Sequence, residues 1–487
     1  MQGANRRSNS VKWLATACVL ASVVAVAPQS AVAVPVVAIV LAVYRWPDAA
    51  LELAVFSVLG LRPSLDVFSV REQGLGTFQV NPAVVFGLFV LVVAACLALR
   101  RGRSGRSMWP DARLRAAHLW LFASYGIGLL SGWRLYDGPG FEQGLREIVR
   151  ISSIVAGFLL VLWWIEADHG RYRTGWICLA VGLLPPLAVA TWQLMTGTGY
   201  REPDGLSRLQ GTFSHPNTFG PYLVPFVLAA VGGAVGVHGK ARWWRLAVAA
   251  TLSALVTLSF SRTAVLVLVF GLLLLPILQA RKWGLTALVR ASMVVAGVFV
   301  VGWLAVGSLI KDRFATLSSE TPLREVLQSG VPENSLQWRL INWTVLVTLG
   351  MDEPAAGHGT GMTEVLNPIV NQNTGIPFNA HNDFVRLFFE TGILGLTCYL
   401  IYGVLLSTWA LRTARLTGAA RSSTAFAVVA AFLSMFFFTA GTTELSLQTA
   451  LQYELYGMLA LLAGGVTGTR DPELTPGLTG EPMGRLR

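Results

Sequence analysis

The sequence predicts an all-α fold, a polytopic transmembrane helix bundle of about 12–14 helices with one long extracytoplasmic loop that contains short amphipathic helices. Three observations carry this prediction. Hydrophobic residues make up 54% of the 487 residues and charged residues only 13%, and the mean hydropathy is +0.57. Apolar segments recur at the length of a membrane span, and basic clusters separate them. A water-soluble fold could not bury this much apolar surface.

The apolar segments approach the roughly 20 residues that a helix needs to cross ~30 Å of hydrocarbon. Because lipid offers the backbone no hydrogen-bond partner, each is predicted to be a helix. The first apolar run follows Arg6, Arg7 and Lys12 and ends near Ala33, the general shape of a cleavable signal peptide. An uncleaved first helix is favoured because many apolar segments follow, among them Pro82 to Leu99, Trp176 to Met195, Leu246 to Phe260, Ala264 to Ala280 and Leu285 to Ile310.

The net charge of +11 reflects short basic clusters between the apolar segments, which is typical of membrane topology rather than nucleic-acid binding. The connection from Arg100 to Arg115 has Asp111 as its only acidic residue, so it is predicted to be cytoplasmic. Counting crossings from there also places inside Glu166 to Arg173, Lys240 to Arg245, Arg281 to Arg290 and Arg412 to Arg421. The outer side then receives Leu61 to Asn81, Trp133 to Glu142, Thr196 to Asn217, Ser261, Lys311 to Ala380 and Gly441 to Leu447.

The long stretch from Lys311 to Ala380 is the one extended hydrophilic insertion, and loops of this length are uncommon unless they are functional. Within it, residues 335–350 carry apolar residues at helical spacing, which predicts an amphipathic helix along the outer face through Leu336, Leu340, Trp343 and Val347. We divide the chain into N-terminal transmembrane helices (1–141), a transmembrane core (142–310), the long extracytoplasmic loop (311–382), C-terminal transmembrane helices (383–466) and a flexible cytoplasmic tail (467–487).

The cysteines predict neither a disulfide nor a metal site, because all of them lie inside apolar segments without CxxC or zinc-type histidine spacing. They are Cys18, Cys96, Cys178 and Cys398. The residues that could carry chemistry form instead four polar groups, which the topology brings to the outer side.

The first group runs from Arg208 through His215 to Asn217 and ends where a membrane helix begins; the alternative is an ordinary turn with an N-cap at Asn217. The second is Ser261-Arg262, where two apolar runs meet, and the alternative is a snorkelling arginine. The third is Trp338-Arg339 in the surface helix, which could equally be an interfacial anchor.

The fourth group is His381-Asn382-Asp383, directly followed by an apolar helix that contains Arg386 and Glu390. Asp383, Arg386 and Glu390 lie on one helix face, and charged residues in a membrane segment usually face a bundle interior or an aqueous cavity. Two interpretations stay open: a purely structural ion pair between Arg386 and Glu390, or a role of these residues in substrate binding.

In their order and spacing these groups resemble the O-antigen ligase and O-antigen polymerase superfamily, polytopic bacterial enzymes of the cell envelope. Gly357-His-Gly359-Thr-Gly361 and Glu390-Thr-Gly392-Ile-Leu-Gly395 add to the resemblance, which covers roughly Glu142 to Leu462. It implies a multi-pass enzyme of the cytoplasmic (inner) membrane with its active site on the extracytoplasmic face. Such enzymes take glycans from a polyprenyl diphosphate carrier such as undecaprenyl diphosphate in polysaccharide biosynthesis.

The resemblance also implies an inverting glycosyltransferase without a cofactor or a metal. Arg208, Arg262 and Arg339 would hold the lipid diphosphate, and His381 would be the catalytic base for an acceptor hydroxyl. His215, Asn217, Asn382, Asp383, Arg386 and Glu390 would support them. Guanidinium groups suit a diphosphate leaving group, which departs without needing a proton. Glu202-Pro-Asp204 is the nearest approach to a DxD metal motif on the outer side.

Two questions about function stay open on the sequence. An enzyme of this superfamily could join repeat units into a polymer, attach a finished glycan to a lipid, or glycosylate a protein, so the partners are a polyprenyl-diphosphate-linked glycan donor and a glycan, lipid or protein acceptor. The alternative from another class is a transporter or flippase for lipid-linked glycans, with Arg386 and Glu390 along the path. Transporters more often show repeated halves and broken helices near the midplane.

Overall fold

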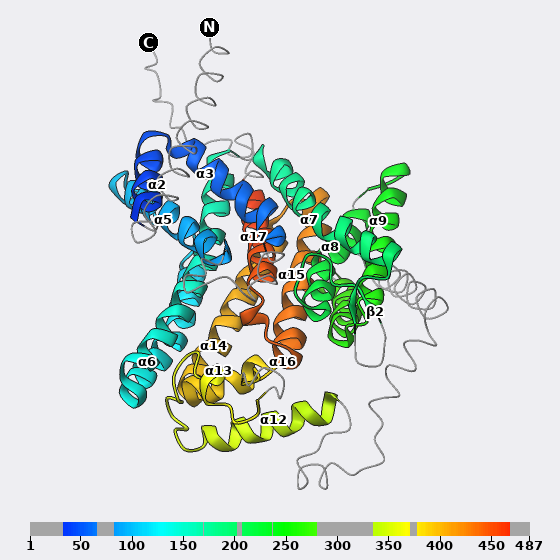
Figure 1. Cartoon of the computed structure of the whole chain (residues 1–487). Helices are drawn as coiled ribbons and strands as arrows, with labels where there is room; N and C mark the ends of the chain where they lie inside the picture. Colours follow the sequence, from blue (N-terminus) through cyan, green and yellow to red (C-terminus); the bar gives the residue numbers. More distant parts are fainter. Residues whose placement is uncertain are drawn as a thin grey trace, which may run out of the picture.

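The computed structural model describes residues 33–65, 82–168, 170–201, 207–235, 237–279, 335–370 and 377–467, and it confirms the predicted all-α polytopic bundle (Figure 1). The questions of an N-terminal signal peptide, the segment Leu285 to Ile310, the first part of the long loop, Glu202-Pro-Asp204 and the tail beyond Thr467 lie outside these residues. The total of 12–14 crossings therefore stays a prediction.

Within the described residues, seven helices are long and apolar enough to span a membrane: Val85–Arg103, Ala112–Ala167, Arg171–Thr196, Pro216–Val235, Arg262–Gln279, Asp383–Leu416 and Arg421–Thr442. The named elements are α2 (Ala33–Arg45), α3 (Pro47–Phe56), α5 (Pro82–Arg103), α6 (Ala112–Ala167), α7 (Arg171–Thr196), β1 (Tyr200–Arg201), β2 (Ser207–Arg208), α8 (Pro216–Val235), α9 (Lys240–Leu258), α12 (Ser335–Gly350), α13 (Thr363–Leu366), α14 (Asp383–Leu416), α15 (Ala419–Ser434), α16 (Ala440–Thr442) and α17 (Thr449–Thr467). Short π and 3₁₀ turns cover Ser57–Leu61, Arg62–Ser64, Met435–Thr439 and Leu445–Leu447.

Helix α6 is two helices joined at Asp137, whose φ of 50° breaks the helical path. The chain reverses there, because Gly132 and Gly140 are in close contact and His118 near the start packs its ring 5.7 Å from that of Phe158 near the end. A side chain at Gly140 would collide with the backbone of Gly132, so glycine permits this tight crossing. The reversal lies within the connection Trp133 to Glu142 that the charge pattern predicts.

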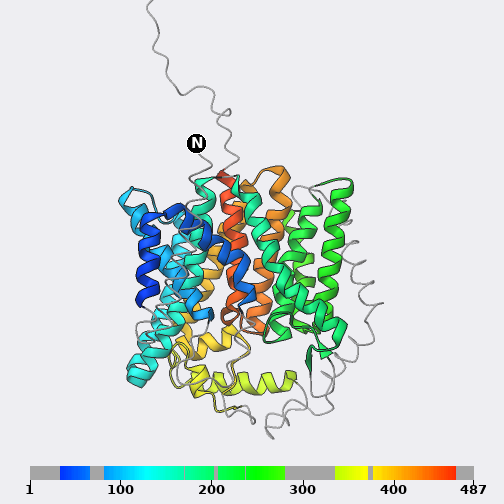
Figure 2. The same cartoon turned by 45° about the horizontal axis from the view of Figure 1, so that its top comes forward.

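The arginine-rich connection lies at one end of this hairpin, and the polar loops lie at the other. Arg101 forms an ion pair with Glu166 at 3.0 Å, near the open end of the hairpin. At the closed end, Arg134 forms an ion pair with Glu353 at 2.6 Å, in the loop that follows α12. The predicted cytoplasmic connection and the predicted extracytoplasmic loop thus lie at opposite ends of the bundle, and Figure 2 shows α12 running across one end of it. Which end faces the cytoplasm stays a prediction.

Helix α14 is likewise broken, at Gly392, where φ is 63°. Phe384 before the break and Tyr399 after it both pack on Phe436, with ring centroids 6.3 and 5.4 Å away. The short first part of α14 therefore lies beside the long second part. A Cβ at Gly392 would meet the backbone of Ala355, so the loop after α12 packs directly on this break.

Helix α17 lies in the middle of the bundle, in contact with α6, α7, α8, α14 and α15 (Figure 1). Its residues Leu451, Met458 and Leu461 are almost fully buried. On the outer helices, by contrast, large apolar side chains such as Leu184 and Trp192 are exposed. In a membrane protein such exposed apolar residues face the lipid. The buried centre and apolar surface therefore agree with a bundle of transmembrane helices.

Helix α12 has the bounds that the sequence predicts, and two of the four apolar residues that predict it are exposed. Leu336 and Val347 are exposed, whereas Gln337, Asn342 and Leu346 are buried against the bundle. The helix therefore turns a partly polar face to the bundle, and its exposed face carries both apolar and hydroxyl side chains. Apolar spacing located the helix, and the polar contacts described below determine its rotation.

Candidate active site

Arg208 lies in the short antiparallel pair of β1 and β2, where it is paired in register with Tyr200. Its side chain is buried, with 3% exposed. The guanidinium donates from Nε to the carbonyl oxygen of Ser259 at 2.9 Å and from Nη2 to Oδ1 of Asn217 at 2.9 Å. Arg208 thus connects three segments: the strand pair, the start of α8 and the end of α9.

The sequence leaves open an ordinary turn with its N-cap at Asn217, and the start of α8 differs from this alternative. The helix begins at Pro216, and His215 Nδ1 accepts the backbone N–H of Asn217 at 3.0 Å. His215 is therefore the capping residue, and Asn217 uses its side chain to hold Arg208. The ring of His215 also packs edge-on against Tyr200 at 4.8 Å.

Arg262 begins the helix Arg262–Gln279, directly after a sharp junction with α9. Phe260 has a left-handed φ of 49° at this junction, and Ser259 and Ser261 are fully buried. The Arg262 guanidinium donates to the hydroxyl of Ser335, the first residue of α12, at 2.8 Å. This arginine therefore contacts the protein segment that carries Arg339.

Arg339 donates from Nη1 to the carbonyl oxygen of Thr442 at 2.8 Å. The hydroxyl of Thr442 in turn bonds to that of Thr263, the neighbour of Arg262, at 3.1 Å. Burial lowers the pKa of Arg339, and the nearby Glu444 opposes this effect. Among the described residues, Arg339 forms no ion pair with a carboxylate.

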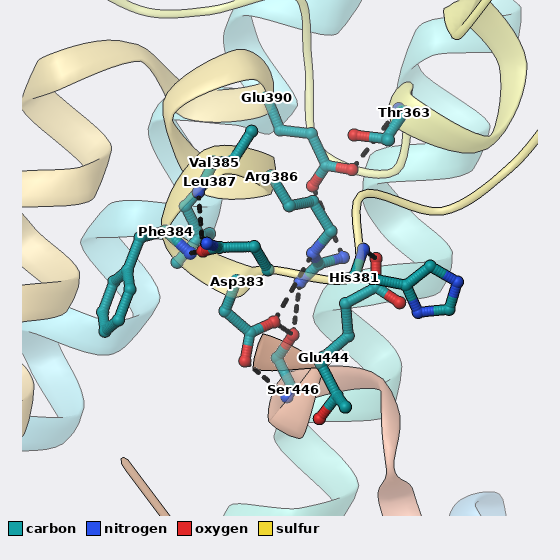
Figure 3. Close-up of polar contacts among 12 residues, drawn as sticks. Thr363, His381, Asp383, Phe384, Val385, Arg386, Leu387, Glu390, Glu444 and Ser446 are labelled. Atoms are coloured by element: carbon teal, nitrogen blue, oxygen red, sulfur yellow. Dashed lines mark hydrogen bonds and ion pairs between the residues drawn. The ribbon is translucent and has the colours of Figure 1, made fainter. Parts of the chain in front are cut away.

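His381 has a left-handed backbone φ of 51°, which is costly for a residue other than glycine. Its backbone N–H donates to Oε1 of Glu444 at 2.9 Å. Figure 3 shows its imidazole pointing away from the charged cluster around Arg386. The ring packs edge-on against Trp338 at 5.4 Å, and neither ring nitrogen hydrogen-bonds to another residue of the described part of the chain.

The backbone on both sides of His381 is held by hydrogen bonds from other segments. On α12, Trp343 Nε1 donates to the carbonyl of Ala380 at 2.7 Å and Asn342 donates to that of Asn379 at 2.9 Å. Asn382 caps α14 by accepting the N–H groups of the first turn, and its amide donates to the carbonyl of Gly441 at 3.0 Å.

The imidazole of His381 is neutral near pH 7. Burial lowers its pKa to about 4, and the positive charges of Arg339 and His215 act in the same direction. A neutral imidazole with no protein partner on its nitrogens can accept a proton.

The charged residues of α14 form a separate cluster that is buried inside the bundle (Figure 3). Arg386 lies 3.5 Å from a carboxylate oxygen of Glu390 and 3.5 Å from one of Glu147 on α6, and its Nη2 donates to the hydroxyl of Ser446 at 2.7 Å. Asp383 accepts the backbone N–H of Ser446 at 2.9 Å. All three α14 residues are at most 2% exposed, so this geometry favours the structural ion pair over direct contact with a substrate.

Sequence reasoning missed two residues of the segment between α16 and α17. Glu444 and Ser446 lie in the predicted outer connection Gly441 to Leu447, but nothing singled them out. Burial raises the pKa of Glu444 to about 8, against the opposing charge of Arg386 and with the support of Asp383. An acid in a short connection between two apolar segments was the available signal.

Together, the segment 441–446, which we call the connecting segment, joins the predicted site residues. It contacts Arg339 through Thr442, His381 through Glu444, Asn382 through Gly441, and Asp383 and Arg386 through Ser446. Arg208 belongs to the neighbouring contacts around Ser259 and Asn217. The described residues contain no group of three His, Cys, Asp or Glu side chains that could hold a metal ion.

The comparison with known proteins agrees with the resemblance carried by the motifs. Residues 247–400 match the family model described as O-antigen ligase. This range includes Arg262, Arg339, His381, Arg386 and Glu390. No curated protein matches the chain. The match supports the O-antigen ligase and polymerase superfamily for this multi-pass membrane protein, and with it a role in processing membrane-associated glycans.

Proposed function

We propose that this protein is a membrane glycosyltransferase that moves a glycan from a polyprenyl diphosphate carrier to an acceptor hydroxyl. In this proposal His381 is the general base, and Arg208, Arg262 and Arg339 bind the diphosphate. The O-antigen ligase match supports the class of substrate. The reaction inverts the anomeric carbon and takes place on the extracytoplasmic face of the inner membrane.

The observation that carries the proposal is the connecting segment, which binds an arginine and a histidine at neighbouring points. Thr442 accepts from Arg339, and Glu444 accepts from the backbone of His381. A cation and an uncharged base therefore lie next to each other at one end of the bundle, although 42 positions separate them in the sequence. This pairing is what a reaction needs when it releases an anion and takes up a proton.

The bond changes follow from these roles. A lone pair of the acceptor oxygen forms a bond to the anomeric carbon while the bond from that carbon to the diphosphate oxygen breaks. The electrons of the broken bond stay on the diphosphate, whose charge the guanidinium groups stabilise. The acceptor proton passes to a ring nitrogen of His381. No proton has to reach the leaving group, so one base is sufficient.

An anionic donor also affects the base. Arg339 is one cause of the low pKa of His381. A bound diphosphate offsets that positive charge, so the pKa of His381 rises toward the range in which an imidazole is an effective base. The bound donor would thus activate the base that deprotonates the attacking acceptor hydroxyl.

The test uses purified full-length protein in lipid nanodiscs, supplied with a polyprenyl-diphosphate oligosaccharide and a set of acceptors. The expected products are free polyprenyl diphosphate and an inverted glycosidic linkage on one acceptor. A second oligosaccharide as the acceptor would identify a polymerase, and a lipid or a protein acceptor would identify a ligase. Movement of the intact donor across vesicle membranes, without release of diphosphate, would contradict the proposal and favour a transporter.

A further inference from the structure

Glu444 is a buried acid whose carboxyl group faces the backbone of the proposed base rather than its ring. It lies in the connecting segment, 5% exposed, and Oε1 accepts the N–H of His381 at 2.9 Å. In Figure 3 its side chain reaches the His381 backbone from below, and the imidazole extends to the right. The carboxyl group is thus placed to orient His381 without contacting the ring nitrogens that would meet a substrate.

The backbone of His381 needs such a partner because its conformation is strained. A positive φ of 51° at a residue other than glycine is costly and persists only where surrounding contacts hold it. On the N-terminal side, Trp343 holds the carbonyl of Ala380. On the C-terminal side, Asn382 is fixed to Gly441. The N–H of His381 itself has Glu444 as its partner, so this bond closes the set of contacts at the strained residue.

Glu444 is itself fixed by the charged cluster beneath it. Two residues further along, Ser446 bonds to Asp383 and Arg386 on α14, and its carbonyl accepts from Arg150 on α6. The connecting segment therefore cannot shift without breaking contacts inside the bundle. The buried cluster acts on the site through this segment.

We propose that Glu444 is a positioning residue, whose carboxyl oxygen holds the backbone of His381 in its left-handed conformation and so aims the imidazole at the acceptor hydroxyl. This inference rests on the proposed function for its catalytic consequence, although the structural part can be tested by itself. A displaced catalytic group of about 1 Å can cost around 10²-fold in rate.

Two substitutions separate positioning from direct catalysis. Glu444→Ala removes the acceptor, so turnover should fall about 10- to 100-fold while the KM for the donor changes by less than about threefold. Glu444→Gln retains an oxygen that can accept the N–H of His381 and should stay within about threefold of the original turnover. If Glu444 were itself the proton acceptor, the glutamine variant would be as impaired as the alanine variant, and the inference would be overturned.

Hydrogen exchange at the backbone amide of His381 tests the contact independently of activity, in the full-length protein in nanodiscs. The amide should be protected in the original protein and in Glu444→Gln, and exchange faster in Glu444→Ala. Glu353→Gln is the matched control, because this acid pairs with Arg134 in the loop that follows α12 and does not contact His381. Unchanged protection in Glu444→Ala overturns the inference. An inactive original protein with an amide that responds to Glu444 overturns only the proposed function.

Discussion

The buried charged cluster and the candidate active site use the same residue types in opposite ways. In the cluster, Arg386 lies within 3.5 Å of the carboxylates of Glu147 and Glu390. In the site, Arg339 bonds to the neutral carbonyl of Thr442, and the nearby Glu444 is protonated near pH 7. The cluster is therefore compensated within the protein, whereas the charge of Arg339 remains available to an anion.

His358 and His381 show the same difference. Both ring nitrogens of His358 have protein partners, the hydroxyl of Tyr136 at 3.0 Å and the carbonyl of Leu349 at 2.9 Å. His381 instead donates its backbone N–H to Glu444, and its ring nitrogens form no hydrogen bond within the described part of the chain. Polar groups whose hydrogen bonds are all made within the protein rigidify the structure. Polar groups that still have a hydrogen-bonding position can bind a substrate. This contrast separates residues that hold the fold from residues that are candidates for chemistry.

The largest effect is expected at His381. In His381→Ala, transfer should fall by about 10² to 10⁴, the usual contribution of a positioned base. Donor binding and expression should change little, because the imidazole forms no hydrogen bond with the residues that the structure describes. Initial rates of polyprenyl diphosphate release, together with donor affinity, provide the measurement.

His358→Gln is the control for that experiment. Because both of its ring nitrogens are occupied by Tyr136 and Leu349, His358 has no free position for an acceptor proton. Transfer in this variant should stay within about threefold of the original rate. A His381→Ala protein that transfers glycan normally would falsify the assignment and direct attention to His215.

Substitutions in the buried charged cluster should lower the free energy of unfolding more than they change the reaction. Arg386→Met leaves the carboxylates of Asp383, Glu147 and Glu390 without their shared cation, so unfolding should become easier by about 3–5 kcal/mol. Arg134→Met removes an exposed ion pair with Glu353 and should cost at most about 1 kcal/mol. Unfolding in mixed micelles of rising SDS fraction measures both. Equal stability of the two variants would contradict the structural role of the cluster.

Substitutions of the arginines in the candidate active site should weaken donor binding and slow the reaction. In Arg339→Lys the charge is retained, but the bidentate guanidinium geometry is lost, so kcat/KM should fall about 10- to 100-fold. Lysine at Arg208 and at Arg262 tests whether these two guanidinium groups reach the same diphosphate. Arg134→Lys is the comparison at the same end of the bundle and should remain close to the original. If Arg339→Lys keeps full activity, its proposed contact with the donor is wrong.

The sequence could predict spans and their ends because these depend on local patterns. The reversal near Asp137, the junction at Ser261 and the bounds of α12 all follow from apolar length and helical spacing. The rotation of α12 could not be predicted, since polar contacts of Asn342 with Asn379 decide it rather than apolar spacing.

The contacts that the sequence analysis did not predict are also long-range ones. Glu444 meets His381 across 63 positions, and Glu147 meets Arg386 across 239, and no periodicity encodes such distances. The superfamily resemblance could select Arg208, Arg262, Arg339 and His381 because their motifs recur in order. A residue such as Glu444, which acts through one backbone contact, has no local motif of its own.

The smallest expected effect is a pH dependence that belongs to the site and not to the cluster. Burial raises the pKa of Glu444 to about 8, so its carboxyl group is neutral at pH 7 and ionises between about pH 7 and 9. The charged or titratable groups that face it are Arg386 and Asp383 on α14, Glu364 on α13, Arg339 on α12, and His381.

Ionised Glu444 would offset part of the charge of Arg339, so the KM for the donor should rise about three- to tenfold from pH 7 to pH 9. Glu444→Gln cannot ionise, and its KM should remain flat over this range. On the acid side, burial keeps the pKa of His381 at about 4, so the free enzyme should retain its base down to about pH 5.

The stability of the fold should depend on pH through the same two residues. The folded protein holds a proton on Glu444 that the unfolded chain releases above its ordinary pKa, so this residue lowers stability as pH rises from about 4.5 to 8. His381 acts in the other direction, because the unfolded chain takes up a proton below about pH 6.5 that the folded protein refuses down to about 4. Glu444→Gln should therefore lose both the decline in unfolding temperature between about pH 4.5 and 8 and the rise in KM between pH 7 and 9. If the variant keeps both, the ionisation belongs to another group, and the neutral acid beside Arg339 is not what keeps the site positive.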